Sequence, residues 1–101
     1  IIIAYSHCIA HGYDLRYGMN QQKLAVESGI WPIFRYNPQL KDEGKNPMIV
    51  DYKKPSKDVK EFMYNETRFK MVENMSPLDA RRYLKIAQDF ADQQYKKYTN
   101  L

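Results

Sequence analysis

Ile1-Ile2-Ile3-Ala4-Tyr5 opens the chain, and this apolar run predicts a β-strand. Successive side chains of a strand point to opposite faces, so isoleucines at consecutive positions indicate burial on both faces, as in a parallel sheet. Such a strand needs neighbours, and the remaining sequence offers few other strands. Because the chain also lacks an initiating Met, we expect a fragment whose missing strands lie upstream. Residues 1–5 would then pair with another copy or expose an apolar edge.

The next segment combines a polar loop with a predicted helix. Residues 6–12 form a loop that ends at a glycine. Apolar residues at roughly helical spacing, among them Met19 and Leu24, then predict a helix that stops at Gly29.

Two short strands are predicted in the middle of the chain. Residues 30–36 and 48–52 are rich in aromatic, β-branched and other apolar residues, and Pro32 confines the first strand to a sheet edge or a strand start. The turn residues of segment 39–47 predict a surface loop between them.

The second half of the chain predicts helices. Residues 58–74 indicate two short helices or one helix broken near Asn65. Ser76-Pro77-Leu78-Asp79 then combines a preferred N-cap, a proline in the first turn and an acidic residue three positions after the cap. We expect the last helix to run over residues 77–98. Its predicted apolar stripe consists of Ala80, Leu84, Ala87, Phe90 or Ala91, and Tyr95.

Composition excludes several classes of protein. A chain of 101 residues, 44% of them hydrophobic, allows one domain at most, and no apolar run approaches the about 20 residues of a membrane-spanning helix. The single cysteine cannot form an internal disulfide, so we expect a reducing compartment, the cytoplasm. The net charge of +4 is spread along the chain without the dense basic block of a nucleic-acid arm.

Cys8 is the first candidate for chemistry, because it lies just beyond the predicted strand of residues 1–5. Ligands of open α/β sheets gather at the carboxyl ends of strands, so Cys8 could be a ligand or a reactive thiol. A buried, inert thiol is the alternative. His7 and His11 flank Cys8, and this His-Cys-x-x-His pattern is a weak signal for zinc that would need a fourth ligand.

Tyrosines alternate with lysines at residues 52–54 and 95–98. Such a mixture can stack on single-stranded bases, but tyrosines at helical spacing more often pack along a helix while the lysines extend into water. No glycine-rich phosphate loop, nucleophile elbow or pair of catalytic carboxylates is present.

The order of residues in four segments resembles the pyruvate:ferredoxin (flavodoxin) oxidoreductases. These segments are Ile-Ala-Tyr-Ser-His-Cys-Ile-Ala-His-Gly at residues 3–12, the run from Gly-Met-Asn-Gln-Gln to Arg-Tyr-Asn-Pro at residues 18–38, Glu-Gly-Lys-Asn-Pro at residues 43–47, and residues 51–55. After Lys57 the resemblance is limited to the general character of a helical tail and includes no specific motif.

The resemblance implies an α/β fold and a place for this chain within it. Residues 1–101 would be a single incomplete domain, the C-terminal part of a thiamine-diphosphate-binding domain. Residues 1–56 would supply its strand, loop and helix portion, and residues 57–101 a helical C-terminal tail.

The resemblance also implies an enzyme that oxidises pyruvate with coenzyme A to acetyl-CoA and CO2. Thiamine diphosphate, Mg2+ and 4Fe-4S clusters would serve the full-length enzyme, which passes electrons to ferredoxin or flavodoxin. The implied partners of this chain are the upstream domains and a second subunit of a homodimer, with no membrane or nucleic acid.

Cys8 is similar in position to the fourth ligand of the cluster nearest the thiamine. His7 and His11 receive no catalytic role, and the thiamine and Mg2+ ligands would lie upstream of Ile1. The isolated chain would be inactive.

Two other classes of function remain open from the residues. A stand-alone basic module could bind an acidic protein or single-stranded nucleic acid through its Tyr and Lys side chains. Cys8 could also act as a redox-sensing thiol, which requires a thiolate that reacts quickly.

Overall fold

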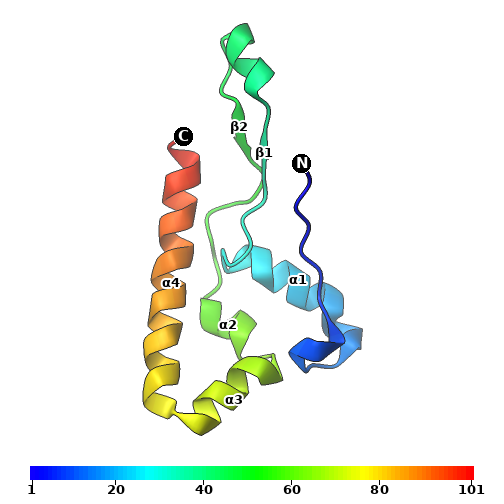
Figure 1. Cartoon of the computed structure of the whole chain (residues 1–101), viewed down its shortest axis with the longest axis vertical. Helices are drawn as coiled ribbons and strands as arrows, with labels where there is room; N and C mark the ends of the chain where they lie inside the picture. Colours follow the sequence, from blue (N-terminus) through cyan, green and yellow to red (C-terminus); the bar gives the residue numbers. More distant parts are fainter.

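The computed structural model describes residues 1–101 as four helices, one small hairpin and several 3₁₀ turns (Figure 1). The helices are α1 (Gly18–Glu27), α2 (Val59–Met63), α3 (Thr67–Met75) and α4 (Pro77–Thr99). The strands are β1 (Phe34–Tyr36) and β2 (Met48–Val50), and the 3₁₀ turns are η1 (Ile9–His11), η2 (Leu15–Tyr17) and η3 (Pro38–Glu43). The architecture is a small helix-rich domain with a two-stranded sheet.

The expected α/β class is borne out in part: short strands followed by helices are present, but the sheet has two strands and is antiparallel. Residues 1–5 form no strand, and Ile1, Ile2 and Ile3 are 120%, 94% and 78% exposed. The physical reason is that no strand of the chain lies beside them, so their backbone groups have no ladder to join. In this chain the apolar side chains of Ile1, Ile2 and Ile3 face solvent, and the pairing of residues 1–5 with another copy stays a prediction.

The hairpin is antiparallel and shorter than the sequence predicts. Phe34 pairs with Val50, Arg35 with Ile49 and Tyr36 with Met48. Pro32 lies before β1, where its missing N–H costs no ladder bond. The loop between the strands is not wholly irregular, because η3 occupies it with Asn37 as an N-cap that accepts a hydrogen bond from Gln39.

The helical expectations are largely confirmed. α1 gives way to a turn at Ser28 and Gly29, and α2 and α3 are separated at the break expected near Asn65. Ser76 caps α4 by accepting a hydrogen bond from the Asp79 N–H, and α4 extends one residue beyond the predicted end. Met19, one of the apolar residues at helical spacing, is 74% exposed.

α4 runs along one side of the molecule, beside α2, α3 and the hairpin (Figure 1). Of the two alternatives for its inner stripe, Ala91 is buried and Phe90 is 58% exposed. The core is small and lies between the helices and the segment after β2. Its apolar members are Ala25, Tyr52, Val59, Phe62, Ala80 and Ala91.

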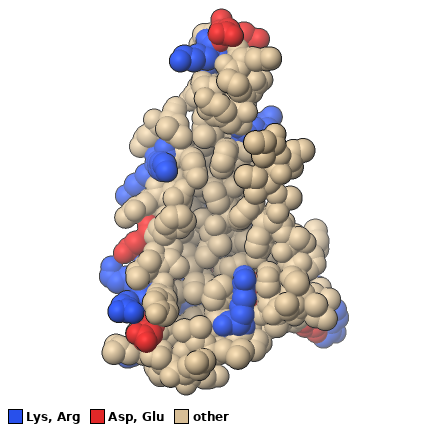
Figure 2. Space-filling model, viewed as in Figure 1, with Lys and Arg blue, Asp and Glu red and all other residues tan.

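No helix has both the length and the apolar character that crossing a membrane requires. Figure 2 shows the Lys and Arg side chains mainly around the edge of one face, interspersed with acidic side chains and without a dense basic patch. This distribution agrees with the even spread of charge along the sequence.

Candidate functional site

Cys8 begins a short, well-defined turn. It is the N-cap of η1 in an extended conformation, and its Sγ accepts a hydrogen bond from the Ala10 N–H at 3.4 Å. Its carbonyl oxygen accepts a second bond from the His11 N–H at 3.0 Å, and Gly12 ends the turn. The cysteine is exposed, which excludes the buried-thiol alternative in this chain.

The two histidines beside Cys8 are directed into the protein. The ring of His7 lies against Gly18, where an added Cβ would be 2.7 Å from ring atoms. The Nδ1 atom of His11 lies 3.9 Å from Oε1 of Glu66. No three His, Cys, Asp or Glu side chains are grouped closely enough to hold a metal ion, so the chain does not assemble the zinc site that the His-Cys-x-x-His pattern suggested.

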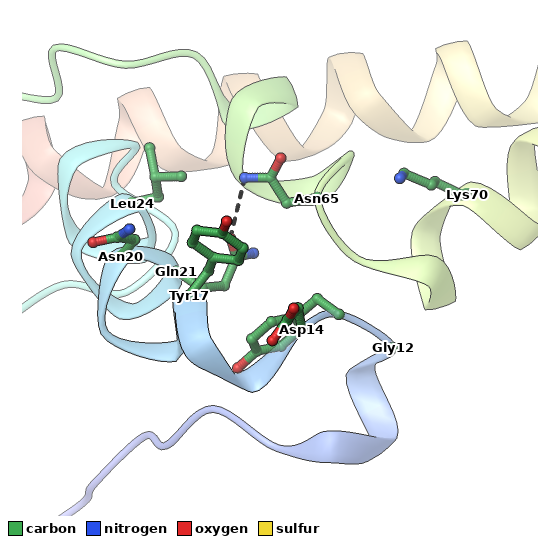
Figure 3. A pocket seen from close by; sticks show the side chains of 9 residues that line it. Gly12, Asp14, Tyr17, Asn20, Gln21, Leu24, Asn65 and Lys70 are labelled. Atoms are coloured by element: carbon green, nitrogen blue, oxygen red, sulfur yellow. Dashed lines mark hydrogen bonds between the residues drawn. The ribbon is translucent and has the colours of Figure 1, made fainter.

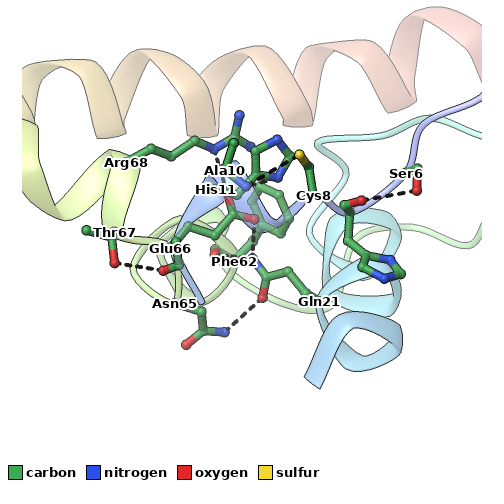
Figure 4. A network of polar contacts seen from close by, with 12 residues as sticks. Ser6, Cys8, Ala10, His11, Gln21, Phe62, Asn65, Glu66, Thr67 and Arg68 are labelled. Atoms are coloured by element: carbon green, nitrogen blue, oxygen red, sulfur yellow. Dashed lines mark hydrogen bonds and ion pairs between the residues drawn. The ribbon is translucent and has the colours of Figure 1, made fainter. Parts of the chain in front are cut away.

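Glu66 is the centre of a buried polar network beneath the Cys8 turn (Figure 4). Its side chain is fully buried and accepts hydrogen bonds from Gln21 Nε2 at 2.7 Å and from Arg68 Nε. Gln21 Nε2 also donates to the carbonyl oxygen of Phe62, and Asn65 donates to Gln21 Oε1. A buried carboxylate is costly unless it is paired in this way.

The carboxylate of Glu66 also affects the pKa values of two nearby tyrosines. Burial raises the pKa of Tyr5, and the negative charge of Glu66 adds to this effect. Burial and then Glu66 also raise the pKa of Tyr13. The hydroxyl of Tyr13 and the Nδ1 atoms of His7 and His11 are buried without a hydrogen-bond partner. Some polar groups around the Cys8 turn are therefore unpaired.

Glu66 is not recognisable as a site residue from the sequence. Its signal is faint, because one acidic residue next to a predicted helix break normally faces water. In the structure Glu66 itself forms the break, with an extended backbone (φ −112°, ψ 130°) before α3 begins. This extended conformation interrupts the helical hydrogen bonding between α2 and α3.

A polar hollow of about 550 Å3 lies next to this network and shares Gln21 and Asn65 with it (Figure 3). Its lining combines amides, phenols and two charged groups: Gly12, Tyr13, Asp14, Tyr17, Asn20, Gln21, Leu24, Asn65 and Lys70. Neither Cys8 nor the flanking histidines line it.

The tyrosines of the Tyr and Lys segments are engaged within the chain. Tyr52 is buried and meets Tyr95 edge to face, with ring centroids 5.4 Å apart. Tyr98 stacks on Phe34 at 4.9 Å. Because these rings already pack on one another, they do not form a free platform for nucleic-acid bases.

Comparison with known proteins gives the family context of this turn. No protein-family model matches the chain. All 101 residues align with 50% identity to a pyruvate-flavodoxin oxidoreductase of Nostoc sp. and with 41% identity to a pyruvate:ferredoxin oxidoreductase of Moorella thermoacetica. This chain is a homologue of one segment of the pyruvate-flavodoxin and pyruvate:ferredoxin oxidoreductases.

The homology confirms the resemblance found in the sequence and extends it. A putative pyruvate-flavodoxin oxidoreductase of Synechocystis sp. also aligns over the whole chain, at 45% identity. Residues 57–101, which resemble the family only in style, are therefore included in the alignment. The chain spans about 8–9% of the length of these relatives.

Proposed function

We propose that this chain is a segment of an enzyme that oxidatively decarboxylates pyruvate to acetyl-CoA and CO2 and passes the electrons to ferredoxin or flavodoxin. The identity of 41–50% over all 101 residues with proteins of these names carries the proposal. In it the chain is the C-terminal part of the thiamine-diphosphate-binding domain, and residues 57–101 are its helical tail. No residue of this chain is assigned to thiamine diphosphate or Mg2+.

The shape of the chain supports a place within a larger body. Its accessible surface is 7648 Å2, whereas a compact monomer of 12.1 kDa is expected to expose about 6000 Å2. Its radius of gyration is 15.9 Å, against about 13 Å for a compact domain of this length. Large side chains such as Ile86 and Phe90 on α4 are 58% exposed. We propose that the upstream domains and a second subunit of a homodimer cover these surfaces, and that the isolated chain is inactive.

Cys8 is the residue that we propose for direct contact with a cofactor, as a ligand of a 4Fe-4S cluster. Such a cluster takes four thiolates, and Cys8 is the only cysteine here, so three ligands would come from other parts of the enzyme. An exposed thiol that already receives a backbone N–H fits this role, because hydrogen bonds to ligand sulfurs help set the potential of such clusters. When bound, the cluster accepts and passes on single electrons. The part played by this chain is to hold the sulfur at the surface of η1.

Cluster content tests the ligand proposal. In the full-length enzyme, Cys8→Ala is expected to lose one 4Fe-4S equivalent by iron analysis and electron paramagnetic resonance. Ser6→Ala is the matched control, because the Ser6 hydroxyl only donates to the neighbouring His7 carbonyl. An unchanged cluster count in Cys8→Ala would remove Cys8 from the ligand set.

The upstream reading frame separates this proposal from a stand-alone binding module. The proposal predicts upstream cysteines, including Cys-x-x-Cys, in the same coding region. A complete frame without them would favour the module instead, as would salt-sensitive binding to an oligonucleotide. Rapid alkylation of Cys8 in the cluster-loaded enzyme would favour a redox-sensing thiol, because a ligand sulfur is blocked by iron.

A further inference from the structure

The corner between α2 and α3, at Glu66 and Thr67, is hydrogen-bonded to Gly12 at the end of the Cys8 turn. Thr67 donates two hydrogen bonds to the carbonyl oxygen of Gly12, from its backbone N–H at 2.9 Å and from its hydroxyl at 2.7 Å. The backbone N–H bond takes the place of the helical bond that the break at Glu66 interrupts. These bonds join residues that are 55 positions apart in the sequence.

Hydrogen bonds within the turn connect Gly12 to the thiol of Cys8. The Gly12 N–H donates to the Ile9 carbonyl at 3.1 Å, the His11 N–H donates to the Cys8 carbonyl at 3.0 Å, and the Ala10 N–H donates to the Cys8 sulfur at 3.4 Å. Gly12 has a φ of +77°, and a Cβ there would lie 2.5 Å from the Cβ of Thr67. Only glycine therefore allows this close approach without rearrangement.

Glu66 fixes the corner from the inside (Figure 4). Its fully buried carboxylate is bound by Gln21 of α1 and by Arg68 of α3, and it faces the His11 ring at 3.9 Å. The network thus joins α1 to the α2–α3 corner, and its carboxylate lies against His11 of η1. A buried carboxylate with these partners tolerates little movement, because any displacement leaves a charge or a donor unpaired.

We propose that Thr67 and Glu66 are positioning residues for Cys8, which hold the turn so that its sulfur is presented to the cluster in one orientation. This inference rests on the proposed function, in which Cys8 is a cluster ligand. It makes physical sense because the remaining ligands would lie outside this chain, so one well-placed thiolate needs a rigid support within the chain.

Three threonine variants of the full-length enzyme test the attachment. Thr67→Val keeps the side-chain shape and the backbone bond but removes the hydroxyl bond, Thr67→Ser restores the hydroxyl, and Thr99→Val is the matched control. Thr99 also uses its hydroxyl on backbone carbonyls, those of Tyr95 and Lys96, but at the far end of α4. The readouts are the paramagnetic resonance spectrum of the reduced cluster and the rate at which a chelator removes its iron.

We expect Thr67→Val to alter the spectrum and to release iron about fivefold faster, as the loss of one hydrogen bond to the turn predicts. Thr67→Ser and Thr99→Val should match the unmodified enzyme. Glu66→Gln, with exposed Glu73→Gln as its control, should likewise change the spectrum. A role limited to general stability would not give a change confined to one cluster and reversed by serine.

The outcomes separate this inference from the proposed function. If Cys8→Ala keeps its full cluster count, the ligand proposal fails. If Cys8→Ala loses the cluster while Thr67→Val and Glu66→Gln leave spectrum and iron release unchanged, only the positioning role is overturned. Should both variants misfold, amide exchange in the unmodified enzyme decides: the N–H groups of residues 11 and 12 should be protected, and rapid exchange there would contradict the inference.

Discussion

Arg35 and Asp51 are joined by two parallel hydrogen bonds, from Nε to Oδ2 and from Nη2 to Oδ1, each 2.8 Å long. The pair links β1 to the residue that follows β2 and reinforces a sheet of only two strands. The hydrogen bonds from Arg35 hold the pKa of the Asp51 carboxyl below its usual value. Bidentate pairing of this kind is stronger than a single neutral hydrogen bond.

The hairpin should therefore loosen in acid. Because the pKa of Asp51 is lower in the folded state, its contribution is present above the ordinary carboxyl pKa and is lost as the pH falls through the folded value. Protection factors of the β1 and β2 amides in the full-length enzyme should fall below about pH 4. Asp51→Asn should remove this pH dependence. Asp42→Asn, in the exposed loop of the same hairpin, should retain it; equal profiles for the two variants would contradict the role of the pair.

Gly12→Ala should open the Cys8 turn. The substitution forces an alanine to φ +77° and places its Cβ 2.5 Å from that of Thr67, so we expect a local loss of about 2 kcal/mol or more. Gly44→Ala is the matched control, because φ is +73° there but nothing lies within 4 Å of the added Cβ. It should cost only about 1 kcal/mol. Hydrogen exchange of peptides that cover each glycine measures the difference, and similar losses at both sites would show that the contact with Thr67 is unimportant.

Ser76→Ala should fray the first turn of α4. The Ser76 hydroxyl accepts from the Asp79 N–H and donates to the Asp79 carboxylate, and removal of such a cap costs about 1 kcal/mol. Amide exchange of residues 78–80 should accelerate accordingly. Ser56→Ala, at an exposed position outside any helix, is the control and should leave these amides unchanged.

Ile86→Asp tests the proposal that α4 packs against other parts of the enzyme. Ile86 is 58% exposed in this chain, so an aspartate there should hardly disturb the chain itself. If the upstream domains or a second subunit cover this face, however, the buried charge should reduce the yield of assembled enzyme in size-exclusion chromatography. Arg81→Asp, at an exposed polar position of the same helix, should have little effect. Normal assembly of Ile86→Asp would mean that this face remains in water.

The helices are largely predictable from the sequence, because helix capping depends on a few residues that are close together in the chain. Ser76 and Pro77 satisfy or avoid free N–H groups wherever the chain is placed, and so the start of α4 follows from four residues. The isoleucines at residues 1–3 form no strand here, because the strand expected of them needs neighbouring strands that this chain does not supply.

The network at Glu66 lay beyond sequence reasoning for a different reason. Glu66, Gln21 and His11 come from separate segments, and only folding brings an otherwise ordinary surface-type carboxylate into contact with them. Cys8 was singled out from its place in the sequence, and the structure adds that its sulfur is exposed and hydrogen-bonded. Its role as a cluster ligand stays a prediction.

The most direct test replaces the Cys8 sulfur by selenium in the full-length enzyme and records X-ray absorption at the selenium edge. If Cys8 is a cluster ligand, the spectrum will show an iron atom bonded to the selenium. A selenium atom surrounded only by carbon would contradict the assignment.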